Sequence, residues 1–329
     1  MVIVTSTTAA HLPRSKLMAK SVKQHMPQCK VIIGLMEENL PYPHWNLDCC
    51  DEIVLIKNTG IYPNFHKFIF QYKAAEGAGT GKAQILKYAC QKYESEEIFV
   101  YLDTDMKVYG PFEELQDIFR DHSIVITPHL IHFPEPLSLQ QIKNIKFHGI
   151  YNAGFVAIKR DQAAIKFLDW WIRQIEHHGY IDSEIFGDQS WIDFVPPYFD
   201  NVYILRHPGY NTAFWNYHER TASISGDQIL IDGLPLRCFH FSHYNSTFVH
   251  VIRTLREDQQ NYYNKLRNDY ANELGQIDIG YLSGTRWSYD CFSSGEPIKD
   301  QTREVYRMFH HTRPDISNPF LLSNSFFGQ

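Results

Sequence analysis

The sequence predicts an α/β protein in which a sheet of parallel strands carries helices on both faces. Short runs of aliphatic residues, such as Val2–Thr5 and Val31–Leu35, alternate with longer stretches whose apolar residues recur at helical spacing. Apolar runs without polar alternation are typical of strands that are buried on both faces. The regular alternation of strand and helix is typical of parallel sheets.

The elements expected from the start of the chain lead to an acidic pair. In order they are a strand at 2–5, a helix with Met18, Val22 and Met26 on one face, strands at 31–35 and 53–56, a helix at 82–93 and a strand at 98–102. The last strand is wholly apolar and ends at Asp103-Thr104-Asp105. Ligands of open α/β sheets gather at the carboxyl ends of strands, because the loops there are free to carry polar groups. We therefore expect the chemistry of this protein at Asp103 and Asp105.

The rest of the chain continues the sheet and then changes character. The expected elements are a short helix after Pro111, strands at 124–127 and 151–159, a helix capped by Asp161, and strands at 202–205, 229–231 and 236–241. A loop rich in Pro and His, 128–136, could act as a lid. Beyond about residue 250 a charged helical stretch, 251–274, leads into an irregular tail. We therefore expect a main domain over residues 1–250 and an appended lobe over residues 251–329.

Composition and charge exclude several classes of protein. The chain has 329 residues, of which 44% are hydrophobic and 15% aromatic, so it can bury a large core and is not disordered. Its net charge of -6, with no dense Lys/Arg block, argues against a nucleic-acid partner. The six cysteines contain no CxxC pair and are expected to be free thiols in a reducing compartment. Without a signal peptide or a run of 18 apolar residues, the sequence predicts a cytoplasmic protein with no membrane span, for which peripheral membrane association stays open.

The acidic pair has the pattern of a divalent metal site. Two carboxylates separated by one residue at the end of a buried strand can share a cation such as Mn²⁺ or Mg²⁺, which takes oxygen ligands and leaves positions open for substrate phosphates. This D-x-D is the only one in the chain. A nucleotide diphosphate is the natural occupant of such a site. The alternative is a pair of solvated loop carboxylates.

The sequence around the pair resembles one family. Val100-Tyr101-Leu102-Asp103-Thr104-Asp105 is similar to the YLDxD signature of retaining GT-A glycosyltransferases, the group of glycogenin and bacterial lipooligosaccharide galactosyltransferases. Asn152-Ala153-Gly154 resembles an element that contacts the donor sugar in that family, and Asp188-Gln189 resembles a pair beside the anomeric carbon. Phe239-His240-Phe241-Ser242 resembles the segment whose histidine completes the metal shell. The resemblance implies metal ligands at Asp103, Asp105 and His240.

The chain departs from the family pattern after His240. His243 stands in place of the family's Gly and is a candidate donor-binding residue. Tyr244-Asn245-Ser246 replaces the family's Lys-Pro-Trp, which puts a lysine contact to the pyrophosphate from this loop in doubt. Lys82 is similar in position to a basic residue near the donor phosphates, although it could be an exposed helix lysine. Thr5 and Ser6 stand where the family contacts uridine or its equivalent, although small hydroxyl residues after a strand are also common turn formers.

A second stretch resembles bacterial transferases of polysaccharide biosynthesis. It spans Arg206 to Asn211 and continues to Trp215, and for His207, Asn211 and Trp215 substrate contact and simple loop packing are both open. Asp188, likewise, could be a helix N-cap instead of a catalytic group. If it is catalytic, the family resemblance leaves open attack on the leaving-group face or a transient adduct with Gln189 or Asp188.

The resemblance implies a complete reaction. It predicts a GT-A fold, a mixed sheet with helices on both faces and a small C-terminal helical and irregular lobe, with the donor and metal site in residues 1–250 and acceptor contacts in residues 251–329. The predicted enzyme is a hexosyltransferase that uses Mn²⁺ or Mg²⁺ and a nucleotide diphosphate sugar, with a UDP-sugar favoured. The acceptor would be a glycan, a lipid-linked saccharide or a protein, and anomeric configuration would be retained.

Three other functions are alternatives to this one. A phosphatase of the haloacid dehalogenase type also has a D-x-D after an apolar strand, but normally near the start of its domain, and Lys107 stands here where that family has Thr or Val. A protein that binds a nucleotide sugar or glycan without turnover is the second alternative. A zinc hydrolase using His240 and His243 is the third, but the helical spacing and the general-base Glu of such sites are missing.

Overall fold

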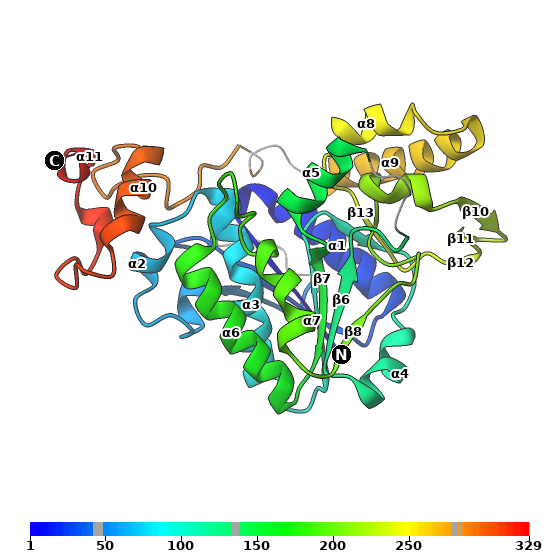
Figure 1. Ribbon diagram of the computed structural model, residues 1–329, viewed down its shortest axis with the longest axis horizontal. Helices are drawn as coiled ribbons and strands as arrows, with labels where there is room; N and C mark the ends of the chain where they lie inside the picture. Colours follow the sequence, from blue (N-terminus) through cyan, green and yellow to red (C-terminus); the bar gives the residue numbers. More distant parts are fainter. Residues whose placement is uncertain (42–48, 133–137, 278–281, 283, 329) are drawn as a thin grey trace.

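A seven-stranded sheet forms the centre of the protein in the computed structural model, which describes residues 1–41, 49–132, 138–277, 282 and 284–328. The strand order is β3-β2-β1-β4-β7-β6-β8 (Figure 1). The bounds are β1 Val2–Thr7, β2 Lys30–Leu35, β3 Glu52–Leu55, β4 Ile98–Leu102, β6 Ile124–Pro128, β7 Tyr151–Lys159 and β8 Val202–Ile204. β7 alone runs antiparallel to its two neighbours, and the other pairs are parallel.

Helices cover both faces of this sheet (Figure 1). Helices α3 (Ala74–Lys92) and α6 (Gln162–His178) share a core with Val2 and Val4, whereas α1 (Leu12–His25) and α4 (Glu114–Asp121) share a second core with Ile3. Successive side chains of a strand point to opposite faces, so a wholly apolar strand supplies both cores. The predicted mixed α/β sheet with helices on both faces is confirmed.

Two small sheets extend the central one. β5 (Met106–Val108), β13 (Cys238–His240) and β9 (Thr212–Ala213) form the first, in which β13 is antiparallel to β5 and parallel to β9. A meander of β10 (Ala222–Ser225), β11 (Gln228–Ile231) and β12 (Leu234–Pro235) forms the second. The pairing of β13 with β5 sets His240 opposite Met106, one residue after Asp105.

Several short elements connect these parts. They are α2 (Phe65–Ile69), α5 (Leu139–His148), α7 (Val195–Tyr198) and α11 (Asn324–Phe327), together with the 3₁₀ segments η1 (Ala9–His11), η2 (Ile56–Asn58), η3 (Gln189–Phe194), η4 (Phe214–Glu219) and η5 (Pro319–Leu321). The predicted loop 128–136 lies partly outside the described residues, because 133–137 belong to a gap. Among the described helices, none is long and apolar enough to cross a membrane.

The residues after 250 pack in two different places. The charged stretch expected as one helix is two, α8 (Thr247–Ile252) and α9 (Glu257–Ile277), which share a core with β13. Residues 284–328, with α10 (Asp300–Phe309), instead join the core of α3 and α6. The two parts lie at opposite ends of the molecule (Figure 1). The division at residue 250 stays a prediction.

Some element bounds differ from those expected. β1 continues to Thr7, which places Thr5 and Ser6 inside the strand and not at its end. α3 begins at Ala74, eight residues before the expected start at Lys82, although its first turns contain three glycines. Glycine is a poor helix former, so tertiary packing overrides local propensity here. The Asp161 cap of α6 is confirmed, since its carboxylate accepts a hydrogen bond from the Ala164 N–H at 2.9 Å. No disulfide joins any of the six cysteines, all of which the structure describes.

Arg303 attaches the C-terminal segment to the core. Its side chain is buried and donates hydrogen bonds to the carbonyls of Phe70, at 2.8 Å, and Tyr289, at 2.6 Å. Carbonyl groups that are buried without a partner cost free energy. The guanidinium therefore provides hydrogen-bond donors for carbonyls in two segments that are more than two hundred residues apart in sequence.

Replacing Arg303 with Met should lower the free energy of unfolding by about 2–4 kcal/mol, because two buried carbonyls lose a charged donor. Chemical denaturation followed by circular dichroism measures this change. Arg256→Met is the matched control, since Arg256 is exposed and, among the described residues, forms an ion pair only with Asp258, and it should change stability by less than about 0.5 kcal/mol. Equal effects of the two substitutions would contradict the anchoring role of Arg303.

Candidate functional site

Asp103, Asp105 and His240 form a compact cluster at the edge of the sheet. Asp103 directly follows β4, and its N–H donates to the carbonyl of Gly154 at 2.9 Å, so the turn after the strand is held by β7. Nε2 of His240 lies 3.0 Å from Oδ1 of Asp105 and 3.8 Å from Oδ2 of Asp103. One ligand-type atom from each residue lies within 4.8 Å of the others.

The second ring nitrogen of His240 is held by Asn211. Nδ1 lies 3.1 Å from the Asn211 side-chain oxygen, which can only accept, so Nδ1 carries a hydrogen. Nε2 is therefore the ring nitrogen that faces the carboxylates of Asp105 and Asp103. Burial alone would lower the pKa of His240, but the neighbouring Asp105 and Asp103 raise the pKa above its ordinary value.

Two cations offset the charge of the half-buried Asp105. Burial alone would raise the pKa of this carboxyl, but His240 and Arg14 hold the pKa well below its usual range. Arg14 lies in the first turn of α1, with its guanidinium 5.7 Å from the centre of the Tyr244 ring. Arg14 is not among the residues predicted from the sequence. Its place at the start of the helix that follows β1, at the carboxyl edge of the sheet, was the available signal.

Lys82 joins Asp103 to Asp188. Its ammonium is buried and lies 3.0 Å from Oδ1 of Asp103 and 3.1 Å from Oδ2 of Asp188. Burial alone would lower the pKa of Lys82, but the two carboxylates raise the pKa above its ordinary value. The alternative of an exposed helix lysine is therefore wrong. Oδ1 of Asp103 also accepts a hydrogen bond from the Tyr101 hydroxyl at 2.9 Å.

Asp188 is half-buried beside Lys82, and its side chain does not cap a helix. It precedes η3, but its side chain makes no capping hydrogen bond and faces Lys82. Burial raises the pKa of Asp188 above its ordinary value. A Cβ atom at position 79 would overlap the Asp188 carboxylate, so Gly79 provides the space in which this side chain lies.

Gln189 and the Asn152-Ala153-Gly154 segment form one hydrogen-bonded unit. Oε1 of Gln189 accepts from the Asn152 amide at 2.9 Å and from the Ala153 N–H at 3.1 Å, and Nε2 donates to the carbonyl of His148 at 2.7 Å. A Cβ atom at Gly154 would lie 2.6 Å from the Asn152 side-chain oxygen and from a carbon of His240. Only glycine at position 154 lets these groups approach the cluster.

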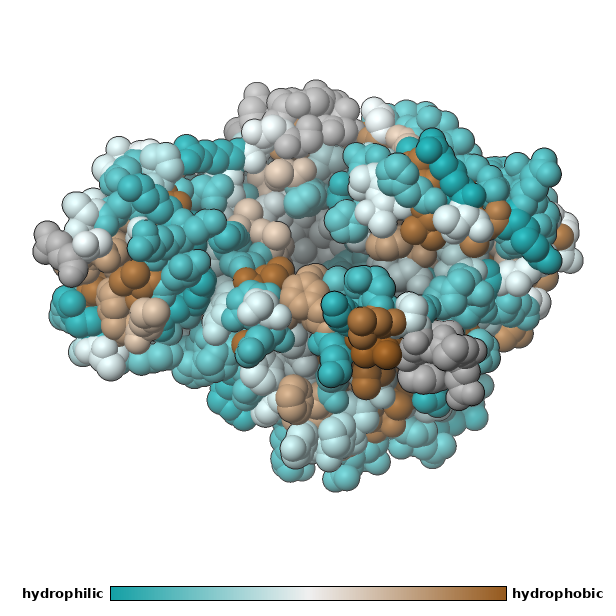
Figure 2. Space-filling view, turned by 45° about the horizontal axis from the view of Figure 1, so that its top comes forward, coloured by the Kyte–Doolittle hydropathy of each residue, from teal (hydrophilic) through white to brown (hydrophobic). Residues whose placement is uncertain are grey.

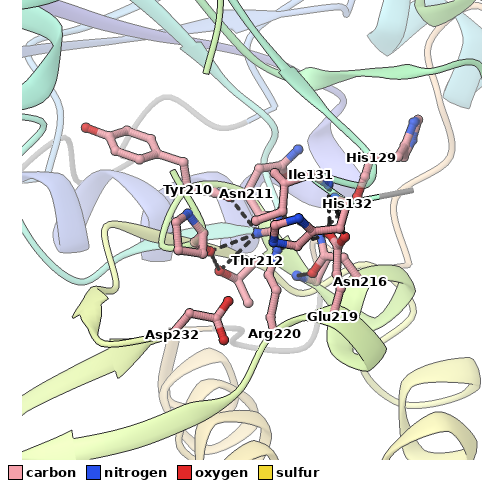
Figure 3. A network of polar contacts seen from close by, with 12 residues as sticks. His129, Ile131, His132, Tyr210, Asn211, Thr212, Asn216, Glu219, Arg220 and Asp232 are labelled. Carbon is pink, nitrogen blue, oxygen red and sulfur yellow. Dashed lines mark hydrogen bonds and ion pairs between the residues drawn. The ribbon is translucent and has the colours of Figure 1, made fainter. Parts of the chain in front are cut away.

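A buried arginine holds the loop that carries Asn211. Arg220 donates to the carbonyls of Pro208, at 2.9 Å, and Tyr210, at 2.8 Å. Figure 3 shows Arg220 beside the loop of Tyr210, Asn211 and Thr212. Asn216 donates to the carbonyl of Asn211 at 3.1 Å. Asn211 has a positive φ of 48°, a conformation that Asn tolerates better than most residues. The amide of Asn211 donates to the Asn152 oxygen at 3.0 Å, so this loop is connected to the site.

The remaining predicted residues differ in their distance from the cluster. The Trp215 ring packs edge-on against His240, with ring centres 5.0 Å apart. Thr5 and Ser6 are buried in β1, and their hydroxyls have no hydrogen-bond partner within the described residues. His207 instead faces Glu114 at 3.6 Å, and exposed His243 packs beside Phe214. Neither of these two histidines contacts the acidic pair in the described part of the chain.

The cluster has the chemical character of a divalent cation site. Two carboxylates and one imidazole are ligands that Mn²⁺ accepts, and their oxygens also suit Mg²⁺. The ligand atoms converge closely enough to share one ion, and Gly154 keeps the space beside them open. The space-filling view shows a recess on one face between the end that carries α10 and the end that carries α9 (Figure 2).

The fold and site define a mixed α/β protein with an acidic, metal-type cluster at the carboxyl edge of its sheet. The chain is 32% identical over 235 residues to the uncharacterized protein YfnF of Bacillus subtilis (strain 168), covering 70% of this chain and 75% of YfnF. The chain belongs to the family of YfnF. The protein YfnD of the same organism is 25% identical over 170 residues, which is 50% of this chain and 52% of YfnD. No family model matches the chain.

Solved structures that align with this chain include three transferases. The galactosyltransferase LgtC, solved with donor and acceptor sugar analogues, aligns with a TM-score of 0.48 and 16% identity over 84% of this chain and 96% of its own. A glycosyltransferase involved in glycosylation of the major capsid of PBCV-1 aligns with a TM-score of 0.42 and 13% identity over 80% of this chain and 98% of its own. Mouse xyloside xylosyltransferase 1 aligns with a TM-score of 0.43 and 12% identity over 73% of this chain and 96% of its own.

His129 contributes a pH-dependent term to stability. Its Nε2 lies 3.3 Å from the Asn152 amide nitrogen, a donor, so the ring is neutral, and burial, helped by His148, lowers its pKa from 6.5 to about 4. The unfolded chain binds a proton at His129 near pH 6.5, and the folded chain only near pH 4. Stability is therefore complete above pH 6.5 and is lost as the pH falls toward 4, by up to about 3 kcal/mol.

His129→Gln should flatten this part of the pH profile. Urea unfolding between pH 4 and 7 measures it, with the wild-type protein losing stability more steeply on acidification than the variant. His250→Gln is the control, because His250 is exposed and should leave the slope unchanged. A variant at position 129 with the wild-type slope would contradict a buried neutral imidazole there.

Proposed function

We propose that this protein is a metal-dependent glycosyltransferase of the GT-A type that moves a sugar from a nucleotide diphosphate donor, with a UDP-sugar favoured, to a glycan, a lipid-linked saccharide or a protein. One observation carries the proposal. Asp103, Asp105 and His240 come from two sheets and converge at the carboxyl edge, where Asn152 and Gln189 also lie. The alignments to transferases agree with this reading, and so does the resemblance of the D-x-D segment to retaining enzymes.

Breaking a bond between a sugar and a diphosphate builds positive charge at the anomeric carbon and negative charge on the departing diphosphate. Asp103, Asp105 and His240 would hold Mn²⁺ or Mg²⁺, which when bound supplies Lewis-acid stabilisation of diphosphate charge. Arg14, which lies close enough to lower the pKa of Asp105, would contribute further positive charge. It would take the part of the lysine that the His243 loop does not offer.

The sugar would lie against the Asn152-Ala153-Gly154 segment. The amide of Gln189 is held through both its oxygen and its nitrogen, so its orientation is set before a substrate arrives, which reduces the cost of reaching the transition state. Asp188 lies beside Lys82, with its Oδ2 3.1 Å from the ammonium, and would face the developing positive charge at the anomeric carbon. Retention of configuration, a hexosyl donor and acceptor contacts from residues 251–329 belong to the same proposal.

Binding of metal and diphosphate should be cooperative. In a thermal-shift assay, UDP with Mn²⁺ should raise the melting temperature more than either alone, by an amount equal to about 2.7 kcal/mol of stabilisation at a hundred times Kd. Asp105→Ala and Asp105→Asn should abolish the rise. Asp117→Ala, which changes an exposed carboxylate, should keep it. An undiminished rise in both Asp105 variants would remove the basis of the proposed site.

Arg14 should act on the diphosphate and not on the metal. Arg14→Met should weaken UDP binding by about 10–100-fold, the value of a hydrogen bond to a charged group. It should not weaken Mn²⁺ binding, because removing a positive charge near Asp105 does not disfavour a cation there. Isothermal titration of UDP in the presence of Mn²⁺ measures the first, and titration of Mn²⁺ alone the second. Arg256→Met is the control. Unchanged UDP affinity would contradict the role of Arg14. Release of phosphate from simple phosphomonoesters by the wild-type protein would instead contradict the proposed glycosyltransferase function.

A further inference from the structure

Three histidines converge at a place distant in sequence from the acidic pair. His177 lies at the end of α6, and His310 and His311 follow α10 directly. Nδ1 of His177 lies 2.9 Å from Nε2 of His311, and the rings of His310 and His311 have centres 3.6 Å apart. One nitrogen from each of the three lies within 4.8 Å of the others. No step of the proposed glycosyl transfer uses these residues.

A hydrogen bond fixes His310 in a tautomer that leaves Nε2 able to bind a metal. Its Nδ1 lies 3.1 Å from the carbonyl of Arg307, which can only accept, so Nδ1 carries the hydrogen and Nε2 carries the lone pair. That Nε2 is buried and has no hydrogen-bond partner in the described part of the chain. Histidines that bind metals typically donate their other ring N–H to a carbonyl or carboxylate, which fixes the tautomer and the ring orientation.

The cluster consists of imidazoles without a carboxylate among them. Burial and the neighbouring His311 lower the pKa of His310 to about 4, and burial and the neighbouring His177 lower the pKa of His311. The acidic cluster at Asp103 and Asp105 has the opposite character, because its ligands are mainly oxygens.

The ligand type and the distances indicate which metal fits. Zn²⁺ is bound by imidazole nitrogen at 2.0–2.1 Å in tetrahedral sites, which places two such nitrogens about 3.3 Å apart. Nδ1 of His177 and Nε2 of His311, which lie within hydrogen-bonding distance, are 2.9 Å apart, and this is close to that value. Imidazole also suits Cu²⁺ and Ni²⁺ but not Mg²⁺. Three protein ligands leave a fourth position for water, and His177 and His311 are both exposed.

We propose that His177, His310 and His311 form a Zn²⁺ site that links the end of α6 to the end of α10. Such a link would attach the C-terminal segment to the central domain in addition to Arg303, because α10 and α6 belong to segments more than a hundred residues apart in sequence. An ion that binds only the folded state stabilises it by mass action. The inference does not depend on the proposed glycosyl transfer.

Zn²⁺ titration of the full chain, freed of metal by chelation, tests this site. The experiment uses the Asp105→Ala background, so that ions bound by the acidic cluster do not contribute. Isothermal titration should find one Zn²⁺ per chain, and Zn²⁺ should raise the melting temperature. Mg²⁺ should do neither. Adding His177→Ala or His311→Ala should lower Zn²⁺ affinity by at least the roughly 10–100-fold loss that follows removal of an outer-shell partner.

His250→Ala is the matched control, because it removes an exposed histidine on α8, outside the cluster. It should leave Zn²⁺ affinity and the thermal shift unchanged. Both cluster positions tested are exposed, so the variants should fold, and circular dichroism verifies this. Zn²⁺ affinity that is unchanged in the His177 and His311 variants, or lowered equally in the His250 variant, would overturn the site. Because Asp105 is absent throughout, failure of the proposed transferase activity leaves this result unaffected.

Discussion

The candidate site depends on holding three half-buried carboxylates in one region of the protein. Asp103, Asp105 and Asp188 repel one another, and burial adds a desolvation cost to each charge. Lys82 lies between Asp103 and Asp188, and His240 faces Asp105. Each cation is itself buried, so neither partner is stable there without the other. A divalent ion at Asp103, Asp105 and His240 would add positive charge at the point where the carboxylates are nearest to each other.

Strand direction explains how these groups meet. The parallel strands β1, β2 and β4 end at one edge of the sheet, and β7, which runs the other way, begins there. The Asn152 segment at the start of β7 therefore lies beside Asp103 at the end of β4. The three-stranded sheet of β5, β13 and β9 adds His240 and the Asn211 loop from much later in the chain. Glycines at 79 and 154 leave the space that larger residues would fill.

Sequence patterns predicted part of this arrangement well. Strands β4 and β7 have the expected bounds, and the only D-x-D of the chain ends β4, because buried strands leave a clear apolar signature. The resemblance to GT-A enzymes picked out Asn152, Gln189 and His240, which the structure brings to the acidic pair. His207 and His243, chosen from nearby segments, lie apart from it, because a position in a loop does not determine the direction of its side chain.

Other features left no local pattern. The sequence leaves open whether Asp188 is a helix cap or a catalytic group, and only the structure shows its contact with Lys82. Arg14, Arg220 and the cluster of His177, His310 and His311 were not anticipated. Their partners are distant in the chain, and no spacing rule connects them. The early start of α3 was also missed, since its glycines argue against a helix until their packing is known.

The sequence by itself determined the order of strands and helices, the placement of Asp103 and Asp105 at a strand end, and the absence of long apolar runs. These follow from local periodicity and composition, which each segment carries independently. The tertiary structure alone decided the reversed direction of β7, the pairing of β13 with β5 and the burial of Lys82. These depend on register and packing between segments that lie far apart in the chain, where many arrangements share the same local pattern and only the complete set of contacts selects one.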